Sequence, residues 1–504
     1  MTPNDPTSAT PPPLRGQLIR GAAWMVATKW GVRLLGIIST FILARLLEPE
    51  DFGLAAMTMV LVASVNILFE FGVDYAVITS SSADRATLDT GWTLRLLQAL
   101  GAGATMLALI PFAGFIYDDE RVVPILLVVA VASMVRGSAN IGVVLFRREL
   151  EFRREFTYEL LTKVAAMIAT LALALWLRNY WALVIGIVVS YAAEVVFSYV
   201  MHPYRPRFSL AAFSAIWSFS KWMLATHIGN HIATRIDRVF VGALGGPQVV
   251  GHYSIGGEIA NMAGPEITAP VSRALIPGFA KLRDEPARLD QAYLKSLAAA
   301  ALVGAPCSIG LALVAPAFIP IALGPNWDAA VPVVQILCFY ALLRTLVTAS
   351  AVLNMVSGHI DAVAKIALLR AALTPFAVYA GFRLAGIEGI AWSKVLLVAF
   401  NFWAISWLVT TTRDINRARL VDVVWRPLVA AALMAGAVRL ITGFVATGAD
   451  GLVLGVQITT GAITYALAVL GLWLGCGKPG GIERDVLEML AARRHRSAAA
   501  GQKS

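Results

Sequence analysis

The sequence has 504 residues, of which 58% are hydrophobic and only 14% are charged. A soluble protein carries about 25% charged residues, so this composition excludes a water-soluble globular protein and indicates that much of the surface faces lipid. Lys and Arg exceed Asp and Glu by 41 − 31, a net charge of +10, which in a membrane protein must be interpreted by location rather than as nucleic-acid binding. We expect no nucleic-acid partner.

Apolar segments long enough to cross a bilayer follow one another along the chain. A crossing needs about 20 residues, and about fourteen such segments can be placed. They lie near 19–47, 53–78, 90–116, 122–147, 157–178, 181–201, 214–242, 249–275, 294–318, 331–357, 362–381, 386–410, 425–445 and 452–475. The sequence therefore predicts an all-α polytopic membrane protein, with a disordered tail at 1–18 and a basic tail at 476–504.

Charge distinguishes the loops on the two sides of the predicted membrane. The loops on one side carry Arg15, Arg20, Arg85, Arg147, Arg148, Arg153, Arg154, Arg205, Arg207, Lys281, Arg283, Arg288, Arg413, Arg417 and Arg419. The alternate loops hold few basic residues and carry acidic ones such as Glu48, Glu50, Asp51, Asp118, Asp119 and Glu120. Because basic loops stay on the cytoplasmic side, we expect a bacterial inner-membrane protein with both termini in the cytoplasm.

The sequence contains no signature of catalysis or of a cofactor. No loop is long enough to form a separate catalytic domain, and neither a phosphate-binding glycine loop nor a nucleophile elbow occurs. The three cysteines stand at unrelated spacings, which predicts no zinc or disulfide framework. His227 and His231 have the spacing of a metal pair but lack an obvious third ligand. We expect no enzyme, no metal and no cofactor.

Two loops six spans apart resemble each other. Residues Pro49–Gly53 join the first and second predicted spans, and residues Pro247–Gly251 join the seventh and eighth; both have the pattern Pro-x-x-x-Gly. An even number of intervening spans keeps both copies in the same orientation, so the pattern indicates parallel repeats. Chance is the alternative, because Pro and Gly are common in loops.

Ionisable side chains concentrate on the spans that flank these loops. Each costs about 2.5–3.5 kcal/mol at mid-bilayer on insertion scales, so most must line water or pair with one another. The first, second, seventh and eighth spans carry polar stripes that include Lys29, Arg33, Glu70, Asp74, Asn230, Arg235, Asp237, Arg238 and Glu258. These stripes favour a cationic aqueous cavity over scattered structural ion pairs. Single charges such as Arg95, Lys163, Lys365 and Lys394 are expected to lie near helix ends, from which their side chains reach the headgroups.

Several segments resemble those of a known family of membrane proteins. They are Ala44–Leu54, Asp237–Gly242, Gly251–Ser254, Pro270–Pro277 and Gly324–Ala330, and together they resemble the polysaccharide flippases of the MOP exporter superfamily, in particular the colanic-acid-exporter-like branch. The resemblance implies two six-helix lobes, 19–201 and 214–410, around a central cationic cavity, with two additional helices in 425–475. It also implies alternating access for an undecaprenyl-pyrophosphate-linked oligosaccharide, in exopolysaccharide or O-antigen export.

The stripes suggest roles for individual residues under this interpretation. Arg offers bidentate contacts to a diphosphate, so the expected substrate-binding residues are Lys29, Arg33, Arg235, Arg238 and Asn230. The expected ion-coupling or orienting residues are Glu70, Asp74, Asp237 and Glu258. Expected partners are the lipid-linked oligosaccharide, membrane lipids and the polysaccharide polymerase and export machinery. A peptidoglycan-precursor flippase and a cation-coupled drug exporter remain as alternatives.

Overall fold

The computed structural model describes residues 14–477 except 71, 75–76, 78–83, 150, 265–274, 276–277, 414 and 446–449. Within its helices, the side chains of 14–23, 25–26, 114–116, 214–237, 445 and 450 also lie outside the described residues. The tails expected at 1–18 and 476–504 therefore fall almost wholly outside the description, although helix α1 already begins at Leu14. All regular elements in the described part of the chain are helices, which confirms the predicted all-α class.

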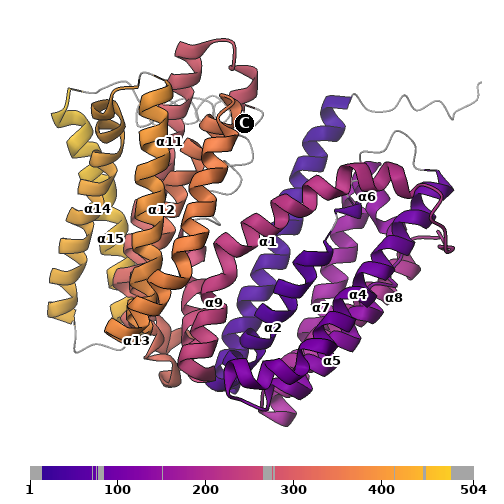
Figure 1. Ribbon diagram of the computed structural model, residues 1–504. Coiled ribbons are helices and arrows are strands. Elements are labelled where there is room, and N and C mark those ends of the chain that lie inside the picture. Colours follow the sequence, from indigo (N-terminus) through magenta and orange to yellow (C-terminus); the bar gives the residue numbers. More distant parts are fainter. Residues whose placement is uncertain are drawn as a thin grey trace, which may run out of the picture. The chain divides into compact units, whose positions relative to one another are not determined.

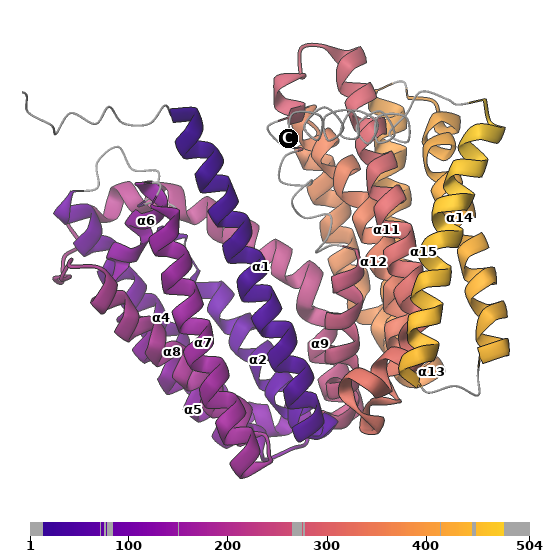
Figure 2. The same ribbon diagram turned by 180° about the vertical axis from the view of Figure 1, so that it is seen from behind.

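The chain divides into two compact units (Figures 1 and 2). Unit 1 comprises Met1–Ile232 together with Gly246–Gln248, and unit 2 comprises Ala233–Gly245 and Val249–Ser504. The helices of unit 1 are α1 (Leu14–Leu46), α2 (Pro49–Phe69), α4 (Arg85–Tyr117), α5 (Val122–Arg136), η1 (Ile141–Val144), α6 (Leu145–Arg148), α7 (Phe152–Leu177) and α8 (Trp181–Met201). In this unit α7 packs against α1 and α8, and α5 packs against α2, α4 and α8.

Unit 2 is built on the second part of α9 (Phe213–Ala263) and on the helices that follow it. These are α11 (Pro286–Leu323), η2 (Pro325–Trp327), α12 (Ala330–Val356), α13 (Ile360–Thr412), α14 (Arg417–Val445) and α15 (Asp450–Gly475). Helix α11 packs against α12, α14 and α15, so the two C-terminal helices belong to the same packed body. Its largest described core cluster contains Tyr293, whose hydroxyl lies 2.9 Å from the Ser350 hydroxyl.

Ten described helices are long and apolar enough to cross a membrane, or eleven if the bent pair Val122–Arg136 and Ile141–Arg148 is one span. The two longest helices, α9 with 51 residues and α13 with 53, each contain a non-helical glycine, Gly246 and Gly386 respectively. At about 1.5 Å per residue each exceeds twice the thickness of a hydrocarbon core. The break in each therefore allows the two helical segments that the hydropathy pattern predicts.

The second span ends earlier than expected. The sequence predicts it over 53–78, whereas α2 ends at Phe69 and Gly72 adopts a positive φ of 65°. Because L-residues rarely adopt this backbone conformation, a glycine permits the turn. The backbone leaves the helix at Glu70, so that Glu70 and Asp74 are not one turn apart on a continuous helix.

The two similar loops meet within unit 1. A Cβ atom built on Gly53 would lie 1.7 Å from the carbonyl oxygen of Pro247, so the backbones approach more closely than any side chain allows. Gly246, beside that proline, has a φ of 73°, and the turn around it requires glycine. The Pro-x-x-x-Gly pattern thus marks two backbone segments in direct contact.

An extended segment, residues 202–212, leads from α8 into α9 and is docked on the start of α4; we call it the strap. The buried Asp89 carboxylate accepts hydrogen bonds from the Tyr204 hydroxyl and from the Arg207 amide, the latter at 2.8 Å. The Ser209 amide donates to the Thr93 hydroxyl at 3.0 Å. Polar residues on one face of α4 therefore fix the strap before α9 begins.

Candidate functional site

A polar pocket of about 300 Å³ lies within unit 1, between α2, α4 and α5. Glu70 and Asp74, two of the residues expected to couple ions, both line it together with Asn66. From α4, Arg95 reaches Asp74 with a separation of 4.0 Å between Nη1 and Oδ1. The predicted pair of carboxylates is thus brought into one pocket, where Arg95 pairs with Asp74.

Arg136, on α5, lines the same pocket, and its side chain contacts residues of α8, which packs against α5. Its Nε lies 2.5 Å from Oε2 of Glu194, and its guanidinium stands 4.9 Å from the ring centroid of Tyr191. The Tyr158 hydroxyl donates to the Glu194 carbonyl at 3.1 Å. An ion pair of this kind offsets part of the cost of placing both charges among apolar helices.

The residues expected to bind the head group are divided between the two units. Lys29 and Arg33 are half-buried on α1 in unit 1, and Arg238 is half-buried on α9 in unit 2. The side chains of Asn230, Arg235 and Asp237 lie outside the described residues. The convergence of this set on one head group stays a prediction.

A second group of cations lies within unit 2. Arg344, exposed on α12, donates from Nη1 to Oδ1 of Asn261 on α9 at 3.4 Å. The half-buried Glu258 stands one turn before Asn261 on the same helix. Lys394 on α13 lies 5.0 Å from the ring centroid of Tyr340. The ammonium group is therefore close to an aromatic ring in the helix bundle, and not at a helix end as the sequence led us to expect.

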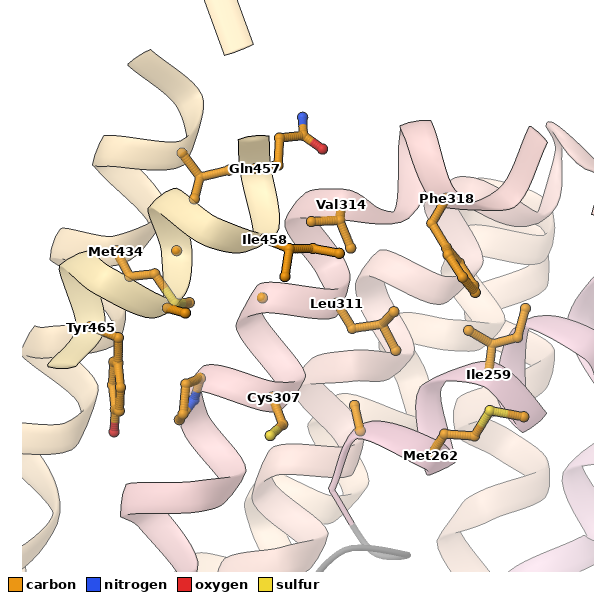
Figure 3. Close-up of a pocket in the computed structure, with 16 residues that line it drawn as sticks. Ile259, Met262, Cys307, Leu311, Val314, Phe318, Met434, Gln457, Ile458 and Tyr465 are labelled. Atoms are coloured by element: carbon orange, nitrogen blue, oxygen red, sulfur yellow. The ribbon is translucent and has the colours of Figure 1, made fainter. Parts of the chain in front are cut away.

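An apolar cleft of about 610 Å³ lies in unit 2 between α9, α11, α14 and α15 (Figure 3). Its lining is almost entirely hydrocarbon and sulfur, and Gln457 is the polar side chain at one end of the close-up. The lining side chains labelled there are Ile259, Met262, Cys307, Leu311, Val314, Phe318, Met434, Gln457, Ile458 and Tyr465. Such a cleft suits a hydrocarbon chain and cannot hold a charged group. Hydropathy did not reveal it, because lipid-facing and cleft-facing residues have the same composition.

Metal ligands do not cluster in the described part of the chain, where no group of three or more His, Cys, Asp or Glu residues could hold an ion. His227 and His231 have side chains outside the described residues. The cysteines are dispersed: Cys338 is buried, Cys476 is exposed and Cys307 lines the apolar cleft. The expectation of no metal site stays a prediction.

Comparison with known proteins relates this arrangement to polysaccharide export. A family model described as "Polysaccharide biosynthesis protein" matches residues 42–332. The lipopolysaccharide biosynthesis protein WzxC of Escherichia coli is 25% identical over 77% of this chain and 80% of its own length. The succinoglycan biosynthesis transport protein ExoT of Rhizobium meliloti is 24% identical over 96% of this chain and 97% of its own.

Solved structures with the same fold are membrane transporters. The lipid II flippase MurJ superposes with a TM-score of 0.72 at 10% identity, over 90% of this chain and 99% of that one. An inward-facing multidrug resistance MATE family transporter of the MOP superfamily gives 0.57 at 14% identity, over 76% and 96%. At these identities the likeness shows the fold alone.

Proposed function

Because the chain belongs to the family of polysaccharide biosynthesis proteins and has the MOP-superfamily fold, we propose that it flips an undecaprenyl-pyrophosphate-linked oligosaccharide from the cytoplasmic to the periplasmic leaflet. The chain is a multi-pass membrane transporter and not an enzyme. The product would serve exopolysaccharide or O-antigen assembly, with the polymerase and export machinery as downstream partners. The membrane would be the bacterial inner membrane, with both termini cytoplasmic as the basic loops indicate.

The apolar cleft is the observation that carries this proposal. A lipid-linked sugar combines a head group that hydrocarbon cannot solvate with a tail that it can. A membrane helix bundle gains little free energy from covering a tail, because lipid is equally apolar. The cleft would therefore position the tail beside the bundle and supply little affinity, while polar groups elsewhere receive the head group.

The cations of the two units would receive the diphosphate. The proposed head-group contacts are Lys29, Arg33, Asn230, Arg235 and Arg238, and the proposed coupling or orienting carboxylates are Glu70, Asp74, Asp237 and Glu258. Alternating access would expose these groups to one side of the membrane at a time. With a negative cytoplasm, the membrane potential favours outward movement of an anion by about 2.3 kcal/mol per charge per 100 mV. A peptidoglycan-precursor flippase is the nearest alternative, because this chain has the fold of the lipid II flippase MurJ.

Filling the cleft tests this function in cells that lack the chromosomal gene. We expect the deletion strain to lose its surface polysaccharide and to accumulate lipid-linked repeat units, and the wild-type protein to restore export. Ala462→Trp should reduce export at least tenfold, because Ala462 lines the cleft and an indole ring would occupy the space of the tail.

Leu467→Trp is the matched control for Ala462→Trp. It adds an indole ring to the same helix at a residue that is 64% exposed and lies outside the cleft lining, so export and protein level should stay normal. Full export by Ala462→Trp at a normal protein level would contradict the role of the cleft. Accumulation of peptidoglycan precursors in the deletion strain, with unchanged lipid-linked oligosaccharides, would identify the alternative substrate.

A further inference from the structure

The amide group of Gln457, on α15, lies at one end of the apolar cleft (Figure 3). Its Nε2 donates to the hydroxyl oxygen of Thr442 on α14 at 2.9 Å, and that hydroxyl donates its own proton to the Val438 carbonyl at 2.7 Å. Because a hydroxyl has a single proton to donate, the Thr442 oxygen can only accept a hydrogen bond from Gln457. These two contacts therefore fix which atom of the amide is nitrogen and which is oxygen.

The amide oxygen of Gln457 is buried and has no hydrogen-bond partner in the described part of the chain. The residue as a whole is only 6% exposed. Thr442 cannot supply a donor, since its proton is already used by the Val438 carbonyl. The cleft thus ends at an unpaired acceptor, which a ligand with an N–H or O–H donor would stabilise.

The other end of the cleft contains an acceptor that the protein itself satisfies. Pro306, in α11, has no N–H, so the carbonyl of Leu302 loses its helical partner. The hydroxyl of Tyr465, on α15, donates to this carbonyl at 2.8 Å. No described side chain does the same for the amide oxygen of Gln457. The two ends of the cleft therefore differ in what they offer to a ligand.

The dimensions of the cleft suit one lipid chain. Its lining on α11 runs from Pro306 to Phe318, which is about 18 Å along the helix and more than half of a hydrocarbon core of about 30 Å. Gln457 lies about 10 Å beyond the start of α15 at Asp450. Because the 26 residues of α15 span about 39 Å, a centred helix places Gln457 inside the hydrocarbon and close to its boundary. The polar end of a lipid lies at this depth.

The chemistry of the cleft selects the kind of donor. A charged ammonium group is excluded, because the lining is apolar and cannot solvate a charge. A buried water molecule typically makes about three hydrogen bonds, whereas Gln457 is the polar side chain at this end of the cleft. An acyl or prenyl chain alone has no donor. A neutral hydroxyl attached to a hydrocarbon chain supplies the hydrogen bond and also fills the cleft.

We infer that the cleft in unit 2 binds a neutral lipid alcohol, with its chain along α11 and its hydroxyl donating to the amide oxygen of Gln457. This ligand differs from the prenyl tail of the proposed substrate, which carries no donor. Both would occupy the same space, so the lipid alcohol competes with the tail. The site depends on the cleft and on Gln457, and it stands whatever molecule the protein transports.

Protection of Cys307 from alkylation tests the site, because Cys307 lines the cleft and is partly accessible. In a variant with Cys338→Ala and Cys476→Ser, the rate of modification by N-phenylmaleimide reports whether the cleft is occupied. The full-length protein is kept in lauryldimethylamine N-oxide, a detergent without hydroxyl groups. Farnesol and farnesyl methyl ether are the probes, since they share one hydrocarbon chain and only the alcohol can donate a hydrogen bond.

We expect farnesol to protect Cys307 at a concentration about fivefold lower than the ether, a difference in the range of one net hydrogen bond. Gln457→Leu and Gln457→Met should each abolish this preference, because neither side chain offers an amide oxygen. Thr459→Leu is the matched control. It removes a polar side chain from an exposed position of the same helix outside the cleft lining, so the preference should remain. Thermal midpoints establish that each variant is folded.

Three results would overturn the site. They are equal protection by the two probes when Gln457 is present, a preference for farnesol that persists in both Gln457 variants, and no protection by farnesol at all. Alkylation is measured without transport. A protein that prefers farnesol but fails to restore polysaccharide export would therefore overturn the proposed function and leave the lipid-alcohol site intact.

Discussion

In this protein, ionised side chains among apolar helices need partners, because an unpaired charge there has a high free-energy cost. Arg136 and Glu194 are separated by 58 residues in sequence and meet at 2.5 Å. This pair is partly buried, and removing one partner would leave the other charge uncompensated, whereas removing both is often neutral.

His202, the first residue of the strap, is expected to make the stability of the protein depend on pH. Its Nδ1 accepts a hydrogen bond from the Tyr204 amide at 3.2 Å, and burial lowers the pKa of the ring below its ordinary value. The unfolded chain then binds more protons than the folded one below about pH 6.5. We expect the thermal midpoint in detergent to fall as the pH is lowered through that range.

The variant His202→Gln isolates this effect. A glutamine carbonyl can accept the same hydrogen bond and does not titrate, so the midpoint of the variant should depend less on pH than that of the wild type. Identical slopes in the two proteins would show that His202 stays neutral in both states, or that other groups dominate the titration. Either result would contradict the assignment.

At the level of elements, the strap connects α8 with α9 through polar contacts that a hydropathy profile does not show. Asn140 donates from Nδ2 to the carbonyl oxygens of His202 and Tyr204, at 3.2 and 2.7 Å. Burial, followed by the hydrogen bond to Asp89, raises the pKa of Tyr204, so its hydroxyl stays protonated and remains a donor. The strap is thus secured to both α4 and the start of η1.

Gly53 gives the strictest test of how the repeated loops are packed. Gly53→Ala places a methyl group 1.7 Å from the Pro247 carbonyl oxygen, and relief requires movement of backbone. Overpacking typically costs about 1–3 kcal/mol and occasionally more, so we expect a clear drop in folded protein and in thermal midpoint, measured by fluorescence-detected size-exclusion chromatography.

Gly436→Ala is the matched control for the loop variant. No atom lies within 4 Å of a Cβ built at Gly436 on α14, and alanine favours a helix by about 0.5–1 kcal/mol over glycine. This variant should therefore be as stable as the wild type or more so. Wild-type behaviour of Gly53→Ala would mean that the two loops do not touch in the folded protein.

For the whole molecule, the accessibility of single cysteines tests the predicted orientation. Cys476 is exposed just beyond the end of α15. In a variant in which Cys307 and Cys338 are replaced by serine, a membrane-impermeant maleimide should label Cys476 in inverted vesicles and leave it unlabelled in intact spheroplasts. Asp118→Cys, introduced into a variant without other cysteines, should show the opposite pattern. Labelling of Cys476 in spheroplasts would reverse the topology.

The sequence by itself determined the all-helical polytopic class, because each crossing needs its own apolar segment and that requirement is local. It also pointed to the family, through the order of loop segments from Ala44 to Ala330, and it placed Glu70 and Asp74 near one another. The orientation, the two lobes and the head-group residues remain predictions, since no contact of Lys29 with Arg238 or Arg235 is described.

Only the tertiary structure decided which distant residues meet. It ended α2 at Phe69, placed Arg95 beside Asp74, paired Arg136 with Glu194 and enclosed an apolar cleft between α9, α11, α14 and α15. Hydropathy measures how strongly a segment prefers lipid and does not tell which face it turns to another helix. Partner choice depends on crossing positions of helices far apart in the chain, so the pairing of Arg136 with Glu194 emerged only when the packing of α5 against α8 was known.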